Sequence, residues 1–204
     1  MNIYLALLLA AVPLFAQGPS KIIWSKSFPG SVPAYAEIVL DKDGAGTYRE
    51  DPKDEDPVKF QYTESEWNQI TTLTQRLDNF SRPLESGLKI AKMGIKTMHY
   101  EGPAGTHETA FNYSEEPDAR ALNDLFEQTL ETERAYIDLQ RCVRFDKLGA
   151  QAAILRVETL RDRKQLMAGR QFLALLDRVT KNESFLHIAR DRAAALAESI
   201  RSIK

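Results

Sequence analysis

Two histidines and a glutamate lie close together near the middle of the chain. His99, His107 and Glu108 belong to two alternating segments on either side of a Gly- and Pro-containing stretch at residues 101–105, a pattern typical of a β-hairpin. A short turn would bring His99 and His107 close together across the hairpin. Imidazole and carboxylate groups serve as zinc ligands and as general bases. These three residues are therefore the candidates for a metal-dependent or hydrolytic enzyme.

The remaining sequence supplies little support for that chemistry. A zinc site needs three or four ligands in a fixed geometry, and the chain has neither a His-Glu-x-x-His motif nor paired cysteines. His187 lies in a helical pattern with no partner evident from spacing. Gly-x-Ser-x-Gly elbows and phosphate-binding glycine loops are also absent from the sequence. We therefore predict no catalytic residues, no metal ligands and no cofactor, and expect that the protein is not an enzyme.

Two further motifs have simple structural explanations. Asp41-Lys-Asp-Gly-Ala-Gly46 begins like a calcium-binding loop, but Ala45 and Pro52 occupy positions five and twelve, where oxygen ligands are required. A hairpin turn at Asp43-Gly44 explains the segment better, because glycine adopts positive φ without steric cost. Cys142 is the sole cysteine, so no intramolecular disulfide forms, and we interpret it as a packed helical residue.

The N-terminus has the pattern of a secretory signal peptide. Residues 3–15 are almost entirely apolar and are followed by Ala16, which suits a cleaved leader and is short for a membrane span. We assign residues 1–16 to the signal peptide and expect the mature protein to begin near Gln17. No cysteine follows to carry a lipid. A buried segment of the mature fold and an uncleaved membrane anchor are the alternatives.

The composition is that of an ordinary globular domain. The chain has 204 residues, 43% hydrophobic and 27% charged, with a net charge of −2. Charge is uneven, because residues 141–204 carry 14 Lys/Arg and 7 Asp/Glu, whereas residues 1–140 carry 13 and 22. The two halves could attract each other within one molecule or present opposite charges to partners.

The histidine hairpin belongs to an expected α+β domain at residues 17–114. Alternation of apolar and polar residues predicts an antiparallel sheet of about five strands, with a central hairpin over residues 33–49. One helix packs on this sheet, and Thr63-Glu-Ser-Glu66 at its start matches a capping box. Residues 115–204 read as a C-terminal part of four helices, the first of them ending at a cap formed by Gly149.

The last of these helices, expected at residues 184–203, has a regular apolar stripe. We predict that this stripe is buried against the third helix, at residues 171–181; the alternative is a docking surface for another protein. The stripe consists of Leu186, Ala189, Ala193, Leu196, Ile200 and Ile203.

Several short motifs lie along residues 21–130. They are Pro33-x-Tyr35, Glu37-Ile-Val-Leu, Asp43-Gly44 with Tyr48, the helix through Trp67, and the second hairpin with Met98-His-Tyr100. With these motifs, about residues 21–130 resemble a bacterial α+β domain of unknown function that occurs in exported and lipid-anchored proteins. The resemblance implies an antiparallel sheet and transfers no catalytic residue. The family often carries a cysteine pair before Pro-x-Tyr, where this chain has Phe28-Pro-Gly-Ser-Val.

Together these observations predict an exported protein of the periplasm or extracellular space. We expect a binding or structural module without catalytic activity, whose partner is another envelope or secreted protein. Nucleic acid is not an expected partner, since acidic residues interleave the basic helices and export separates the chain from nucleic acids. Stable membrane insertion is not expected once the signal peptide is removed.

Overall fold

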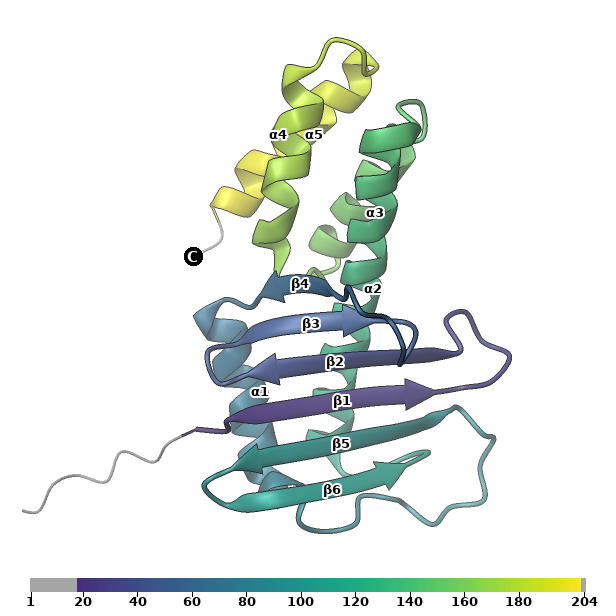
Figure 1. Ribbon diagram of the computed structural model, residues 1–204, viewed down its shortest axis with the longest axis vertical. Helices are drawn as coiled ribbons and strands as arrows, with labels where there is room; N and C mark the ends of the chain where they lie inside the picture. Colours follow the sequence, from purple (N-terminus) through teal and green to yellow (C-terminus); the bar gives the residue numbers. More distant parts are fainter. Residues whose placement is uncertain (1–17, 203–204) are drawn as a thin grey trace, which may run out of the picture.

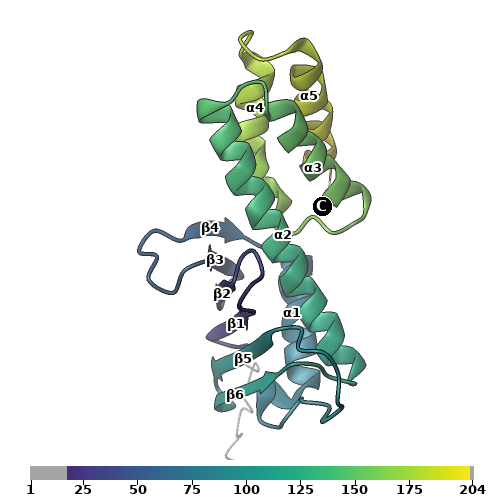
Figure 2. The ribbon, with the colours of Figure 1, turned by 90° about the vertical axis from the view of Figure 1, so that its right-hand side faces the viewer.

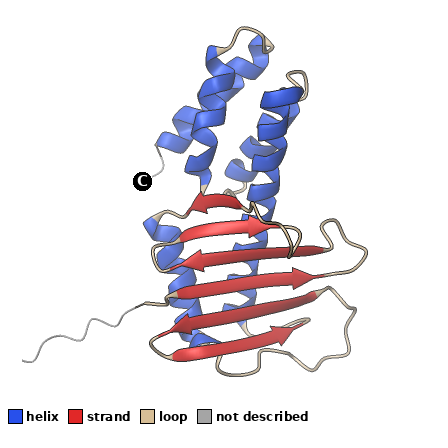
Figure 3. Ribbon diagram, viewed as in Figure 1, coloured by secondary structure: helices blue, strands red, loops and turns tan. Residues whose placement is uncertain are grey.

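The computed structural model describes residues 18–202 and confirms the α+β class (Figure 3). The expected signal peptide, residues 1–16, lies outside the described residues. The strands are β1 Lys21–Ser27, β2 Tyr35–Asp41, β3 Ala45–Arg49, β4 Val58–Gln61, β5 Ile95–Gly102 and β6 Gly105–Phe111. The helices are α1 Glu64–Arg76, α2 Pro117–Phe145, α3 Ala150–Asp162, α4 Leu173–Lys181 and α5 His187–Arg201, with short 3-10 turns η1 Asp78–Phe80 and η2 Gly169–Phe172.

The sheet has six strands rather than about five, in the order β4-β3-β2-β1-β5-β6 (Figure 1). The four-residue β4 completes it at one edge, paired with β3. Every neighbouring pair is antiparallel. The first strand therefore lies in the middle, because β5 returns to its free edge after the crossover through α1.

Two helices, not one, cover the sheet. In the side view both α1 and α2 lie against the same face (Figure 2). Alternation along the strands turns Trp24, Ile38 and Met98 toward them, all fully buried. The Trp24 and Phe126 rings stack with centroids 5.6 Å apart, which joins β1 to α2. The prediction of a single packed helix was wrong, because apolar residues of α2 also pack against the sheet.

Helix α2 is the shared element of two apolar clusters. Its 29 residues extend about 44 Å at 1.5 Å per residue. The first half contributes Leu122, Phe126 and Leu130 to the sheet core. The second half contributes Leu139 and Val143 to a core formed with α3, α4 and α5, which rises beyond the β4 edge in Figure 1.

The helical part differs from expectation at two helix ends. Gly149 does not cap α2; that helix ends at Phe145, and Gly149 precedes α3 with a right-handed φ of −68°. The fourth expected helix begins later, at His187, because Asn182 forms a turn in which its Oδ1 accepts from Ser184 N at 3.0 Å. Leu186, at the start of that helix, is 43% exposed.

The predicted burial of the α5 stripe is otherwise confirmed. Ala189, Ala193, Leu196 and Ile200 are each at most 1% exposed and belong to the helical core. The α4 and α5 helices pack side by side, as Figures 1 and 2 both show. Small alanines on this face permit the close approach. Ile203 lies outside the described residues.

The predicted capping box at the start of α1 is present. Thr63 Oγ1 accepts from Glu66 N at 3.3 Å, and Glu66 Oε2 accepts from Thr63 N at 2.7 Å. Two backbone donors that the first helical turn leaves free are thereby satisfied. The cap fixes where β4 ends and α1 begins.

Thr63→Ala should lower the free energy of unfolding by about 1 kcal/mol, because the hydroxyl that caps α1 is lost. The matched control is Thr72→Ala at an exposed position within α1, which should be neutral or slightly stabilising. Urea unfolding of both variants measures the difference. Equal midpoints for Thr63→Ala and wild type, at equal slopes, would contradict a stabilising cap.

Leu196→Ala should cost about 2–5 kcal/mol, because it opens a cavity in the helical core. Leu186→Ala on the same helix removes an exposed side chain and should change stability by less than about 0.5 kcal/mol. Thermal unfolding followed by circular dichroism checks both. Similar melting temperatures for the two variants would argue against burial of the stripe.

Candidate functional site

The β5–β6 hairpin separates the two histidines of the predicted site. A two-residue loop joins the strands, so His99 pairs with Glu108 and Tyr100 pairs with His107. Residues paired across a hairpin point to the same face, and the neighbouring pair points to the other. His99 therefore lies on the uncovered face of the sheet, and His107 lies on the face that the helices cover.

The contacts on each side agree with this separation. His99 lies between two carboxylates, with Nδ1 3.3 Å from Glu108 Oε2 and Nε2 3.2 Å from Glu101 Oε1. His107 instead stacks on Tyr100 with ring centroids 6.3 Å apart. The predicted trio is thus not assembled, although His99 and Glu108 do meet.

The described part of the chain contains no cluster of potential metal ligands. No group of three or more His, Cys, Asp or Glu side chains within residues 18–202 is arranged to hold a metal ion. His187 is exposed and pairs with Asp191, one turn later on α5, at 2.7 Å. Cys142 is buried, and burial raises the pKa of its thiol, so it does not have the exposure and thiolate character of a nucleophile.

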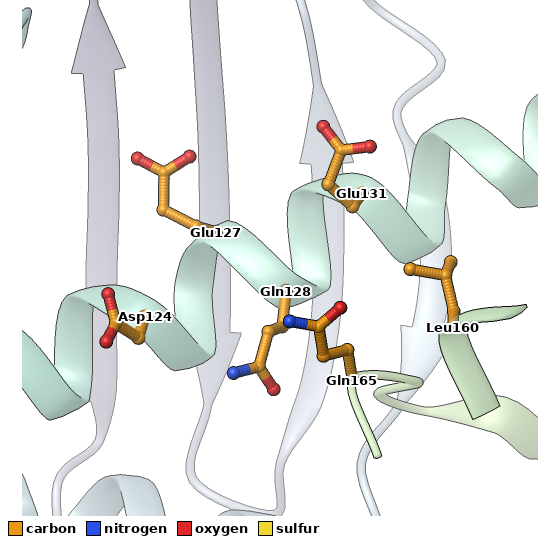
Figure 4. Close-up of a pocket in the computed structure, with 6 residues that line it drawn as sticks. All are labelled: Asp124, Glu127, Gln128, Glu131, Leu160 and Gln165. Atoms are coloured by element: carbon orange, nitrogen blue, oxygen red, sulfur yellow. The ribbon is translucent and has the colours of Figure 1, made fainter. Parts of the chain in front are cut away.

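An acidic cleft runs along α2 near the end of α3. Figure 4 shows its carboxylates and Gln128 on successive turns of α2, with Gln165 beside Gln128 and Leu160 near the end of α3. Its volume is about 370 Å³, and its lining consists of Asp124, Glu127, Gln128, Glu131, Leu160 and Gln165.

Two of the carboxylates in this cleft already have cationic partners. Lys26 Nζ donates to Glu127 at 2.7 Å, and Arg156 Nη2 donates to Glu131 at 3.0 Å. These ion pairs tie β1 and α3 to α2. The cleft can accept polar or cationic groups at its rim, but much of its charge is used within the protein.

The junction between the sheet and the helical part contains a buried acid. Glu133 of α2 is fully buried, and Gln171 Nε2 donates to its Oε1 at 2.6 Å. Burial raises the pKa of this carboxyl from 4.5 to about 8, so the neutral form predominates at neutral pH. Its Oε2 has no hydrogen-bond partner within residues 18–202. Because Glu133 is fully buried, a ligand in solution does not reach it.

Further polar contacts hold the connection between α3 and α4 at this junction. Ala168 N donates to Glu66 Oε1 at 2.9 Å, and Met167 N donates to Thr132 Oγ1 at 3.1 Å. Ala168 has a left-handed φ of 50°. Two adjoining surface hollows of about 360 and 630 Å³ lie beside this connection, at β4 and the start of α1. They could accommodate a small polar ligand.

The position of Glu133 in the sequence is itself a signal, although it belongs to no catalytic or metal-binding motif. It lies four residues after Thr129 and three before Tyr136, on the apolar stripe of α2. A glutamate on such a stripe is seldom fully buried without a polar partner. Its partner Gln171 is 38 residues away, so the pair could not be found by spacing.

No family model matches the chain, and no curated protein and no solved structure matches it significantly.

Glu133→Gln should remove a pH dependence of stability. The pKa of an ordinary glutamate is 4.5, and that of Glu133 in the folded state is about 8. Between these two pH values the folded protein binds more protons than the unfolded chain. The contribution of the protonated Glu133 to the free energy of unfolding is on the order of a few kcal/mol. It is complete below about pH 4.5 and is lost as pH rises through about 8.

The measurement is the urea midpoint from about pH 5 to about pH 8. Relative to wild type, the variant should gain stability as pH rises. The exposed Asp124→Asn change on the same helix serves as the control and should keep the wild-type slope. A parallel pH profile for Glu133→Gln and wild type would mean that Glu133 titrates normally.

Proposed function

We propose that this protein is an exported binding or structural module without catalytic activity, whose partner is another envelope or secreted protein. The observation that carries the proposal is the uncovered face of the six-stranded sheet. Both α1 and α2 lie on the other face, so side chains from every strand remain available to a partner on this side.

The residues of this face form rows across the whole sheet. One row follows the strand register through all six strands and consists of Lys59, Thr47, Val39, Ile23, His99 and Glu108. A parallel row includes Thr97, Ser25, Glu37 and Arg49. The centre is made of hydroxyl and aliphatic side chains, which suits contact with a protein surface.

Charges on this face are largely paired with one another. Arg49 Nη2 lies 2.6 Å from Glu37 Oε1, and Tyr35 Oη donates to Glu37 Oε2 at 2.7 Å. His99 lies between Glu101 and Glu108. Such a surface offers no basic patch for phosphates, in keeping with a protein partner and not a nucleic acid.

Export rests on the N-terminal sequence. The apolar run at residues 3–15 and the small residue after it support a signal peptide and a periplasmic or extracellular site of action. Within residues 18–202, none of the helices has the length and apolar character required to cross a bilayer. We also propose that residues 21–130 belong with the bacterial domain that they resemble, on the ground of the Pro-x-Tyr and turn motifs.

The alternative is a metal-dependent or hydrolytic enzyme using His99, His107 and Glu108. Its remaining support is the 3.3 Å contact between His99 and Glu108. The opposite orientation of His107 removes the third group, so the binding module is the better proposal.

The test is affinity capture from the native envelope fraction with wild type and two variants. Thr47→Arg combined with Thr97→Arg places bulky charges on the uncovered face and should abolish capture of the partner. Gln69→Arg, at an exposed position of α1, should leave capture unchanged. Mass spectrometry quantifies the captured protein, and circular dichroism confirms that the variants fold. Equal capture by all three would contradict a role for this face.

A further inference from the structure

One end of the sheet exposes large apolar side chains on two neighbouring loops. The β1–β2 loop and the segment before β5 both lie at the right-hand end of the sheet in Figure 1. Val32 is 80% exposed, Met93 is 55% exposed and Leu88 is 50% exposed. We define the apolar loop end as Phe28, Val32, Leu88, Ile90, Met93 and Ile95, all of which are exposed.

The two loops are in direct contact at Phe28 and Gly94, which brings their exposed apolar side chains to the same end of the sheet. Gly94 has a φ of +90°, and a Cβ built on it would lie 2.8 Å from Phe28 Cβ. The backbone of one loop therefore lies against the aromatic side chain of the other. Ser27 also pairs with Ile95 at the adjoining strand ends. A contiguous exposed apolar area on a monomer indicates an interaction site.

Polar anchors hold the longer loop in place. Asn112, just after β6, accepts from Met93 N at 2.7 Å and donates from Nδ2 to Ala91 O at 3.1 Å. Glu85 Oε2 accepts from Asn112 N at 2.6 Å. Residues 87–93 are all exposed between these anchors. The apolar side chains thus project from a fixed backbone, which limits the ordering cost of binding.

The charge of this surface is positive. Lys89 and Lys92 alternate with the apolar residues of the loop, and both are exposed. Residues 28–34 carry no charge. The neighbouring acid Glu85 accepts from Asn112 N, which lowers its pKa and keeps it charged. Lys96, which donates to Asn112 O, adds a third lysine against this single carboxylate. Exposed lysines interleaved with large apolar side chains match a bilayer surface, where anionic headgroups overlie the acyl chains.

We propose that the apolar loop end docks reversibly on an anionic phospholipid bilayer. Phe28, Val32, Leu88, Ile90 and Met93 enter the headgroup region, while Lys89 and Lys92 contact lipid phosphates. This interaction goes beyond the proposed function, because it uses the end of the sheet and not its uncovered face. It leaves that face free for a protein partner.

The first test is co-sedimentation of the exported protein with vesicles. Wild type should bind vesicles that contain phosphatidylglycerol more tightly than vesicles of phosphatidylcholine alone, and added salt should weaken this binding. Lys89→Gln with Lys92→Gln should weaken binding about fivefold per lysine. Leu88→Ser with Ile90→Ser should weaken it by about tenfold or more, because the buried apolar area is lost. All four positions are exposed, so the melting temperature should not fall.

The control uses apolar residues at the far tip of the helical part. Phe145 and Leu148 are 79% and 74% exposed, beside Arg144 and Lys147. Phe145→Ser with Leu148→Ser should bind vesicles as wild type does. A tryptophan reporter adds a local readout, since brominated lipids should quench emission from Val32→Trp and not from Phe145→Trp. This readout is independent of any lipid affinity of the N-terminal segment.

Three results would overturn the proposal. These are failure of wild type to bind phosphatidylglycerol vesicles, unchanged binding by both loop variants, and loss of binding by the helical-tip control. Lipid-free capture of a protein by wild type that fails in the Leu88→Ser and Ile90→Ser variant, without vesicle binding, would assign the surface to a protein partner instead.

Discussion

The continuity of α2 is the constraint on which the rest of the structure depends. A single helix of 29 residues has its first half in the sheet core and its second half in the helical core. Because a helix is stiff over this length, the placement of α2 on the sheet also fixes the axis of the helical part. The two cores are therefore parts of one mechanical unit, joined at residues 129–133.

Polar contacts at this junction keep the connection between α3 and α4 against the sheet. Glu66 uses one carboxylate oxygen to cap α1 and the other to accept from Ala168 N. Gln171 reaches the buried Glu133 from the same connection. A buried acid that stays neutral costs less than a buried charge, which explains how a glutamate can occupy the apolar stripe of α2. The uncovered face and the apolar loop end are thereby held in a fixed relation to the helical tip.

Local patterns in the sequence predicted most helices and strands. They did not predict which face of the sheet each histidine lies on, or that one helix contributes to both cores. The alternation in β2 and the capping box at Thr63 are local signals, and both appear in the structure as predicted. The faces of His99 and His107 depend on the number of residues in the turn, and one residue more or fewer would place both on one face. The sequence also did not show that α2 contributes to two cores, because the apolar residues for both cores follow the same helical spacing. Glu133 and Gln171 meet only through tertiary packing.

The position of β1 has a consequence for the order of folding. This strand is first in the described chain, yet it lies in the middle of the sheet, between β2 and β5. Strands β1 to β4 can form a meander as soon as they are made. The other edge of β1 pairs only when β5 is present, as in the pairing of Ile23 with His99. Long-range pairings of this kind slow folding and leave a strand edge open to other chains in the interval. A chain in which β5 has not yet paired therefore presents one open edge of β1, and a factor that shields this edge would protect the protein from aggregation.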